Sequence, residues 1–416
     1  MSNFLTFICT GLLTLTLSAC NHSIANEEAQ LEPAENLKGK VSVWVEMPPR
    51  LIDKHTEQYQ TVVRKYFGLF RRLYPNTEIA IEFIPPTEAD EIYIRFEKQS
   101  IKGLGPNILV AYFDNEVVDL IRANAIEPLN DYEIDWSVFR PEAVKQVLYK
   151  GKYYALPINL ETQVLCYNTD KVKQVPKTLD DLVIQARQGY SVGLHSSFLA
   201  SLWGIQVFGG EILNEEGQFV LDQNDGWKNW MNWLKVARDE PNFSLTDDIE
   251  LLETAFIEGR LAYTSCLSSW IPYYQRTLGK NKVGVTLLPG KNDNSAGPPL
   301  YANLLLFNAA SSRQQMKIAV KLGEYLINKQ QQRRVAAEEE VFIPSVQDAT
   351  VDPRLFPVQS TLIEQSKTAV SVSLEKADAI KVLGNYGDSY YRQVLAGALT
   401  PEQAARELKE AIAQEM

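Results

Sequence analysis

The sequence predicts an α/β protein built from two lobes. Short apolar segments that suit strands alternate along the chain with longer segments in which apolar residues recur at helical spacing,. This β-α-β order is typical of a mostly parallel sheet with helices on both faces. The chain has 416 residues, a length that favours two such units over one,.

The alternation is clearest in the first half of the chain. We predict strands at 41–45, 79–84 and 107–112, and helices at 56–73 and 115–123. Pro75 follows the first helix and ends it,. In parallel sheets, ligands bind beyond the carboxyl ends of the strands. We therefore expect functional residues directly after Trp44 and after Tyr112.

The second half repeats the pattern after a long extended stretch over 153–168. We predict strands at 191–194, 261–266 and 283–288, a helix that opens at 177–181, and further helices at 198–208, 227–236, 251–257, 316–332 and from 358 onward. Thr178 offers a hydroxyl cap to its helix, and Gly209 ends the helix that precedes it,. Pro401 stands at the first position of the last helix,.

Residues 1–20 have the pattern of a signal peptide. No side chain up to Cys20 is charged, and the apolar run over 4–17 is too short to span a bilayer,. The run ends in Leu-Ser-Ala-Cys, which resembles a bacterial lipobox with Cys20 as the lipidated residue, although no Lys or Arg precedes it. Residues 21–38 are polar and predict a tether. We expect an exported protein, lipid-anchored to the bacterial cell membrane and facing the periplasm or cell exterior.

Composition excludes several functions. A net charge of −11 disfavours nucleic acid and anionic membrane surfaces as partners,. The three histidines have no metal-ligand spacing, and no glycine-rich phosphate loop follows a strand, so we expect no cofactor,. Residues 189–193 fit G-x-S-x-G, but Ser191 begins a strand and the last histidine, His195, is only four residues on. No catalytic triad can form from these residues.

The cysteines leave one pairing open. Cys9 leaves with the signal peptide and Cys20 takes the lipid, so Cys166 and Cys266 remain. Cysteines pair in oxidising compartments. Both, however, lie in apolar strand-like stretches, where free cysteine is commonly buried. This reasoning favours two unpaired thiols without deciding the matter.

Several segments, in order, resemble extracellular solute-binding proteins of the maltose-binding-like family 1, which serve ABC importers. The most telling is Gly-Lys-Tyr-Tyr-Ala-Leu-Pro at 151–157, followed by Glu161 and by Leu-Cys-Tyr-Asn-Thr-Asp at 165–170. Further matching segments are 105–108, 256–262 with Trp270, 283–289 and 394–401. The resemblance runs from about Lys38 to Gln414.

The resemblance implies a type II periplasmic-binding-protein fold, with interleaved lobes, hinge strands and closure on the ligand. It implies an N-terminal lobe at 39–158 plus 290–343 and a C-terminal lobe at 159–289 plus 344–416. The implied function is the substrate-binding component of an ABC importer rather than an enzyme. Such a protein captures a sugar, oligosaccharide or sugar-polyol and delivers it to a membrane permease, while the ATPase is another subunit.

The resemblance also implies ligand-binding residues. Trp44 and Glu46 end the first strand, Asp114 follows the third, and Asn115 stands where the maltose binders have arginine. Glu161 matches a hinge carboxylate and Trp270 a stacking tryptophan. The other expected contacts are Thr162, Trp203, Tyr301, Asn385 and Tyr386.

Each of these expectations has an alternative. Trp44 could simply pack the sheet, and Asp114 could only cap the helix that follows. Glu161 is better explained by a polar cleft, because an unpaired buried carboxylate is costly. Three carboxylates beside aromatic rings would also suit a cation such as a polyamine. A glycoside hydrolase using two of these carboxylates is a further alternative.

Overall fold

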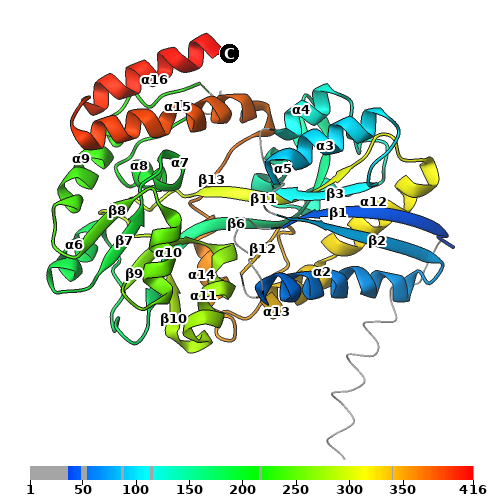
Figure 1. Ribbon diagram of the computed structural model, residues 1–416, viewed down its shortest axis with the longest axis horizontal. Helices are drawn as coiled ribbons and strands as arrows, with labels where there is room; N and C mark the ends of the chain where they lie inside the picture. The colour runs from blue at the N-terminus through cyan, green and yellow to red at the C-terminus, as the bar shows by residue number, and fades with distance from the viewer. Residues whose placement is uncertain are drawn as a thin grey trace, which may run out of the picture.

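The structure is a computed structural model, and it describes residues 36–47, 54–85, 89–112, 116–214, 218–339 and 341–415. The expected signal peptide with Cys20, most of the tether, and the expected site residues Asp114 and Asn115 lie outside these ranges. Leu37, near the end of the expected tether, is buried with the core around α2, so the folded body begins slightly before Gly39. Figure 1 shows two lobes side by side, joined through the middle of the molecule.

The first lobe has a sheet in the order β2-β1-β3-β11-β6. Its strands are β1 (Gly39–Glu46), β2 (Thr77–Ile84), β3 (Ile108–Tyr112), β11 (Pro299–Phe307), the first part of β6 (Ala155–Asn168), β12 (Ile343–Pro344) and β13 (Val370–Ser371), beside the hairpin β4 (Leu148–Tyr149) and β5 (Lys152–Tyr153). Its helices are α2 (Lys54–Leu73), α3 (Ala89–Ile101), α4 (Glu116–Arg122), η3 (Trp136–Val138), α5 (Pro141–Lys145), α12 (Arg313–Ile327) and α13 (Lys329–Glu339).

The second lobe continues from the far part of β6 through β9, β7 and β8. Its other strands are β7 (Val192–His195), β8 (Phe243–Thr246), β9 (Tyr263–Leu267) and β10 (Val283–Thr286). Its helices are α6 (Leu179–Arg187), α7 (Phe198–Ser201), α8 (Trp203–Val207), α9 (Gly226–Arg238), α10 (Ile249–Ile257), η4 (Ser268–Trp270), α11 (Ile271–Leu278), η5 (Lys280–Lys282), α14 (Pro357–Ser366), η6 (Leu374–Lys376), α15 (Ala377–Ala396) and α16 (Pro401–Glu415).

One strand belongs to both lobes. Residues up to Thr162 of β6 pair antiparallel with β11, and residues from Gln163 onward pair antiparallel with β9. The expected extended stretch over 153–168 is thus a single crossing strand from Ala155 to Asn168, while Tyr153 belongs to the hairpin strand β5. The expectation of a mostly parallel sheet is corrected, because at the centre β11 runs antiparallel to β3 and to β6, and β6 runs antiparallel to β9. The outer pairs β1–β2, β1–β3, β7–β8 and β7–β9 are parallel, as expected for β-α-β units,.

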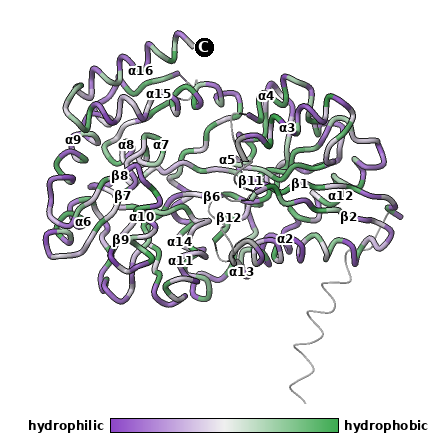
Figure 2. Tube along the Cα trace, in the orientation of Figure 1, coloured by the Kyte–Doolittle hydropathy of each residue, from purple (hydrophilic) through white to green (hydrophobic). Residues whose placement is uncertain are grey.

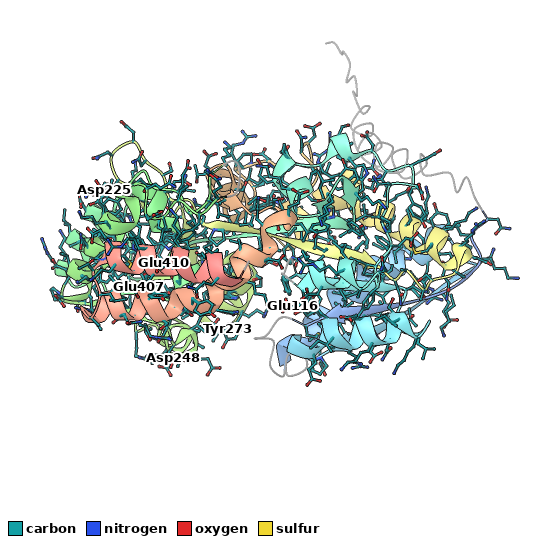
Figure 3. All side chains as sticks on the ribbon, turned by 90° about the horizontal axis from the view of Figure 1, so that it is seen from above. Glu116, Asp225, Asp248, Tyr273, Glu407 and Glu410 are labelled. Atoms are coloured by element: carbon teal, nitrogen blue, oxygen red, sulfur yellow. A yellow bond between two sulfur atoms is a disulfide. The ribbon has the colours of Figure 1, made fainter. Side chains whose placement is uncertain are left out.

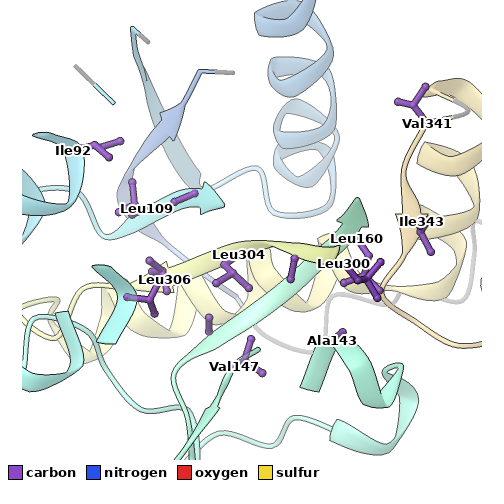
Figure 4. Packing of buried hydrophobic residues seen from close by; sticks show 14 of the residues in the cluster. Ile92, Leu109, Ala143, Val147, Leu160, Leu300, Leu304, Leu306, Val341 and Ile343 are labelled. Carbon is purple, nitrogen blue, oxygen red and sulfur yellow. The ribbon is translucent and has the colours of Figure 1, made fainter. Parts of the chain in front are cut away.

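The core follows the crossing strands. Figure 2 shows hydrophobic residues concentrated along the central strands around β1 and β11. Figure 4 shows the packing beside β6 and β11, where Leu160, Leu304 and Leu306 are fully buried. The same buried cluster includes Phe256 and Tyr274 of the second lobe. The two lobes therefore share apolar packing along β6.

Cys166 and Cys266 form a disulfide, which corrects the preference for unpaired thiols. In the β6–β9 pair, Cys266 lies opposite Val164 and Cys166 opposite Thr264. The two cysteines are therefore diagonal neighbours on one face, with their Cα atoms 6.0 Å apart, which is within bridging distance,. Both cysteines are buried, as the apolar context predicted. Burial alone could not show that their strands are adjacent in this register.

Candidate functional site

A cavity of about 200 Å³ lies at the C-terminal ends of β1 and β3 and beside the middle of β11, facing η4 and α11. Its polar end is lined by Glu46, Tyr59, Tyr112, Asn159, Ser269, Arg276 and Asn303. Ser269 and Arg276 come from the second lobe and the others from the first, so both lobes build this end. Figure 3 shows Glu116 and Tyr273 on the two facing sides of the same boundary between the lobes.

Strand register brings the polar residues into one row. Tyr112 of β3 lies opposite Asn303 of β11, and Asn303 lies opposite Asn159 of β6. Glu46 is the last residue of β1, and its Oε2 accepts a hydrogen bond from the Tyr112 backbone N–H at 3.4 Å. The ends of β1 and β3 and internal positions of β11 and β6 thus present a carboxylate, a phenol and two amides to a single space.

A β-bulge in β6 adds to this arrangement. Asn303 pairs with Asn159 but Leu304 pairs with Pro157, so Ile158 has no partner in β11. Ile158 and Asn159 therefore both line the cavity, although consecutive residues of a regular strand face opposite sides,. The Ile158 carbonyl accepts hydrogen bonds from Gln332 Nε2 and, at 3.1 Å, from Ser345 Oγ. These bonds replace the ladder contact that the bulge removes.

Glu161 lies behind the row rather than in the cavity wall. Its side chain is only 4% exposed, and its Oε1 accepts a hydrogen bond from Asn303 Nδ2 at 2.8 Å. Burial raises the pKa of Glu161, while hydrogen bonds from Asn303 and Ser269 act to lower it,. Asn303 Nδ2 also donates to Asn159 Oδ1. Glu161 therefore orients both amides from beneath.

Two tyrosines complete the polar end. Burial raises the pKa of Tyr59, and the negative charges of Glu161 and Glu46 raise it further. The pKa of Tyr112 is raised by burial and then by the charge of Glu161. Both phenols therefore stay protonated at neutral pH and can donate a hydrogen bond. Tyr59 was not among the expected site residues, although it lies in the helix expected at 56–73, the first helix after β1.

The structure places two predicted tryptophans away from this cavity. Trp44 is 5% exposed beneath α3, where its Nε1 donates to Glu82 Oε2 at 2.7 Å and the Arg95 guanidinium lies 4.4 Å from its ring centroid. This position agrees with the alternative in which Trp44 simply packs against the sheet. Trp203 is 1% exposed, with its ring centroid 4.8 Å from that of Trp230 in the second-lobe core.

The other predicted residues lie around the cavity or apart from it. Thr162 is fully buried, and its Oγ1 donates to the Pro299 carbonyl at 2.9 Å. Tyr301 lies opposite Glu161 in the β6–β11 pair, and half-buried Trp270 directly follows Ser269. Asn385 and Tyr386 are exposed on α15 and are not part of the cavity wall.

The described ranges of the chain lack two further features. Within those ranges, no group of three or more His, Cys, Asp or Glu side chains is arranged to hold a metal ion. In the same part of the chain, no helix has the length and apolar character needed to cross a membrane.

A family model and the similar known proteins agree on one type of protein. A family model described as bacterial extracellular solute-binding protein matches residues 75–354. The maltotriose-binding protein of Pyrococcus abyssi (strain GE5 / Orsay) is 25% identical over 339 residues, which cover 78% of this chain and 70% of that protein. The galactooligosaccharide-binding protein of Bacillus subtilis (strain 168) is 22% identical over 320 residues, which cover 73% of this chain and 75% of that protein.

Solved structures show the same fold. The GacH receptor of Streptomyces glaucescens GLA.O, solved unliganded and with acarbose, superimposes with a TM-score of 0.75 at 19% identity, covering 91% of this chain and 98% of that one. The maltose/maltodextrin-binding domain MalE from Bdellovibrio bacteriovorus, bound to maltotriose, gives a TM-score of 0.72 at 18% identity, covering 90% and 99%. These likenesses confirm the two-lobed, maltose-binding-like fold that the sequence predicts.

Proposed function

Because this chain belongs to the bacterial extracellular solute-binding protein family, we propose that it captures a sugar or oligosaccharide in the cavity between its lobes for an ABC importer. One observation carries the proposal: the row of Tyr112, Asn303 and Asn159, flanked by Glu46, at a cavity to which both lobes contribute. Several relatives are named for malto- or galacto-oligosaccharides, which supports the same ligand class.

The chemistry of the row suits a polyol. Sugar hydroxyls both donate and accept hydrogen bonds, and amides such as Asn159 and Asn303 do the same. Glu46 accepts only, and the protonated phenols of Tyr59 and Tyr112 can donate. The flat ring of Tyr59 can also cover the C–H face of a sugar ring. Glu161 positions the Asn303 amide, so this hinge carboxylate would act on the sugar through that amide.

The remaining site residues stay predictions. Asp114, Asn115, Thr162, Trp270, Tyr301, Asn385 and Tyr386 are retained as expected contacts of the closed form. Trp270 has the best position among them, because it directly follows Ser269 in the cavity wall. The lobe boundaries after 158, 289 and 343, and closure of the lobes on the ligand, are also proposals.

A polyamine ligand is less well supported. Arg276 lines the same cavity as Glu46, so the site is not uniformly acidic. Glu161, another of the three carboxylates, is not part of the cavity wall. A glycoside hydrolase would need two carboxylates at the reacting bond. Incubation with maltotriose and galactotriose separates the classes, because turnover indicates an enzyme and a stable complex indicates a binding protein.

Export and anchoring belong to the same proposal. A disulfide such as Cys166–Cys266 persists in oxidising compartments, which supports a location outside the cytoplasm,. We propose that the segment up to Ala19 is removed, that Cys20 becomes the lipidated first residue, and that the tether holds the binding body near its permease. The acidic chain then contacts the membrane through the lipid alone.

The function is tested by a thermal-shift screen over malto- and galacto-oligosaccharides, sugar-polyols and polyamines. A ligand that binds only the folded state raises the unfolding midpoint. Replacing Asn303 or Glu46 by Ala should then weaken the best ligand by about 1–3 kcal/mol, the loss expected for hydrogen bonds to polar and charged groups. Asn229→Ala, an exposed change on α9, is the matched control. Equal affinities in all variants would remove the site assignment.

A further inference from the structure

The cavity has a second end that is almost entirely apolar. Beyond the polar row it runs between α2 and the sheet, under α13 and the chain that leads into β12. One wall comes from the sheet, through Val45, Val110 and Ile158. The opposite wall is built by Val62, Val63, Phe67, Val335, Ala336 and Phe342.

The polar side chains at this end already have partners within the protein. The Tyr66 hydroxyl donates to Glu338 Oε2 at 2.7 Å. Gln332 Nε2 donates to the Ile158 carbonyl, and its Oε1 accepts from the Ser345 backbone N–H at 2.9 Å. A sugar hydroxyl placed here would lose its hydrogen bonds to water without a designed replacement, which is unfavourable. The sugar therefore belongs at the polar end.

Contacts between α2 and α13 keep the apolar end covered. Glu338 of α13 accepts from Lys65 Nζ at 2.6 Å and from Tyr66 of α2, and Arg334 Nε donates to its other oxygen at 3.0 Å. An engineered apolar cavity of roughly 150 Å³ binds benzene, which shows that a small apolar space inside a protein can hold an aryl group. An aryl or short alkyl group fits such a space.

We propose that the ligand is an amphiphilic glycoside, with its sugar on the row of Tyr112, Asn303 and Asn159 and an apolar aglycone in the cavity end beneath α2. The apolar aglycone would contact Val62, Val63 and Phe67, while the sugar hydroxyls would form hydrogen bonds with the polar groups of the row. This inference rests on the proposed function, because it places the sugar at the same polar end.

The test compares each free sugar with its glycosides by calorimetry. Maltose and lactose are measured beside their p-nitrophenyl and hexyl glycosides, with p-nitrophenol and hexanol alone as references. We expect at least one glycoside to bind tenfold or more tightly than its free sugar. Equal affinities of sugars and glycosides would overturn the inference and leave the sugar-binding function standing.

Two further outcomes are also decisive. Binding of p-nitrophenol or hexanol with no difference between sugar stereoisomers would refute both the amphiphile and the sugar-binding function. No binding by any compound of the panel would refute both as well.

Variants that fill the apolar end make the test specific. Ala336→Phe and Val63→Phe each place a ring in the space, and each should reduce the ratio of glycoside affinity to free-sugar affinity to near one. Ile184→Phe, an equivalent change on the exposed face of α6, should keep the parent ratio. The two filling variants lie on different helices, so a folding defect in one leaves the other informative. An unchanged ratio in a folded filling variant would overturn the placement of the aglycone.

Discussion

Loss of the Cys166–Cys266 disulfide should lower the free energy of unfolding of the second lobe by about 4–5 kcal/mol. The bridge joins cysteines that are 100 residues apart, and the chain between them carries α6 to α10. In the chain-entropy model, closing a loop of about 100 residues raises the free energy of the unfolded state by about 4.7 kcal/mol at 25 °C. This is a large fraction of the stability of an ordinary domain.

Urea unfolding, followed by tryptophan fluorescence, measures the change. Trp203, Trp227 and Trp230 are all buried in the second-lobe core and report on it. A comparison of the oxidised with the reduced parent protein isolates the effect of the cross-link on stability. The Cys166→Ala/Cys266→Ala variant differs from the reduced parent only by the loss of two buried sulfur atoms. A difference below about 1 kcal/mol between oxidised and reduced protein would refute the reasoning, because the loop would then be restricted already in the unfolded state.

Four further predictions follow from the geometry and the sequence. Burial raises the pKa of Glu161 in the folded protein, so the ionised carboxylate opposes folding above that pKa,. In urea unfolding, the Glu161→Gln variant should therefore be more stable than the parent at pH 8 and equally stable at pH 4. Although burial acts against it, hydrogen bonds from Lys65, Tyr66 and Arg334 hold the pKa of Glu338 at about 2. The ionised Glu338 carboxylate therefore stabilises the folded protein above about pH 4.3, and this stabilisation is lost toward pH 2. Glu338→Gln should lower the free energy of unfolding by about 1 kcal/mol at pH 7 and by progressively less toward pH 3. In cells supplied with a fatty-acid analogue, the parent protein should incorporate the label and the Cys20→Ala variant should not. Small-angle scattering should show a smaller radius of gyration with saturating ligand, because the lobes close.

Each of these measurements can contradict its premise. A Glu161→Gln variant that is less stable at pH 8 would mean that the ionised carboxylate is well compensated. A constant cost of Glu338→Gln from pH 7 to pH 3 would show a packing effect instead of a charge effect. Unchanged lipid labelling would remove the anchor, and an unchanged radius would remove closure.

The sequence predicted the order of strands and helices well, because the signals are local. Apolar strands such as β3 and capped helices such as α6 are specified by neighbouring residues, and Thr178 does accept a hydrogen bond from the Asp181 backbone N–H. The resemblance added the two-lobed fold and the crossing strand. The solved relatives confirm the two-lobed fold, and the strand pairing of this chain confirms the crossing strand.

The site was less predictable because it depends on register. Asn159 and Asn303 come from distant segments, and only the β6–β11 pairing with its bulge at Ile158 makes them neighbours. The side on which Trp44 is buried depends on which helix layer covers β1, which alternation alone does not specify. Tyr112 stood at the expected strand end, so a closer look at that end could have identified it.

The interleaving of the lobes has a consequence for synthesis and secretion. β11 lies between β3 and β6 in the first-lobe sheet, yet it follows β7, β8 and β9 of the second lobe in the chain. Neither β3 nor the first part of β6 can complete its hydrogen bonding until the ribosome has added β11. Pairing between segments so distant along the chain is slow. The first-lobe sheet of a nascent polypeptide therefore stays incomplete until β11 has been synthesised, and this delay favours the unfolded state that a narrow translocation channel requires.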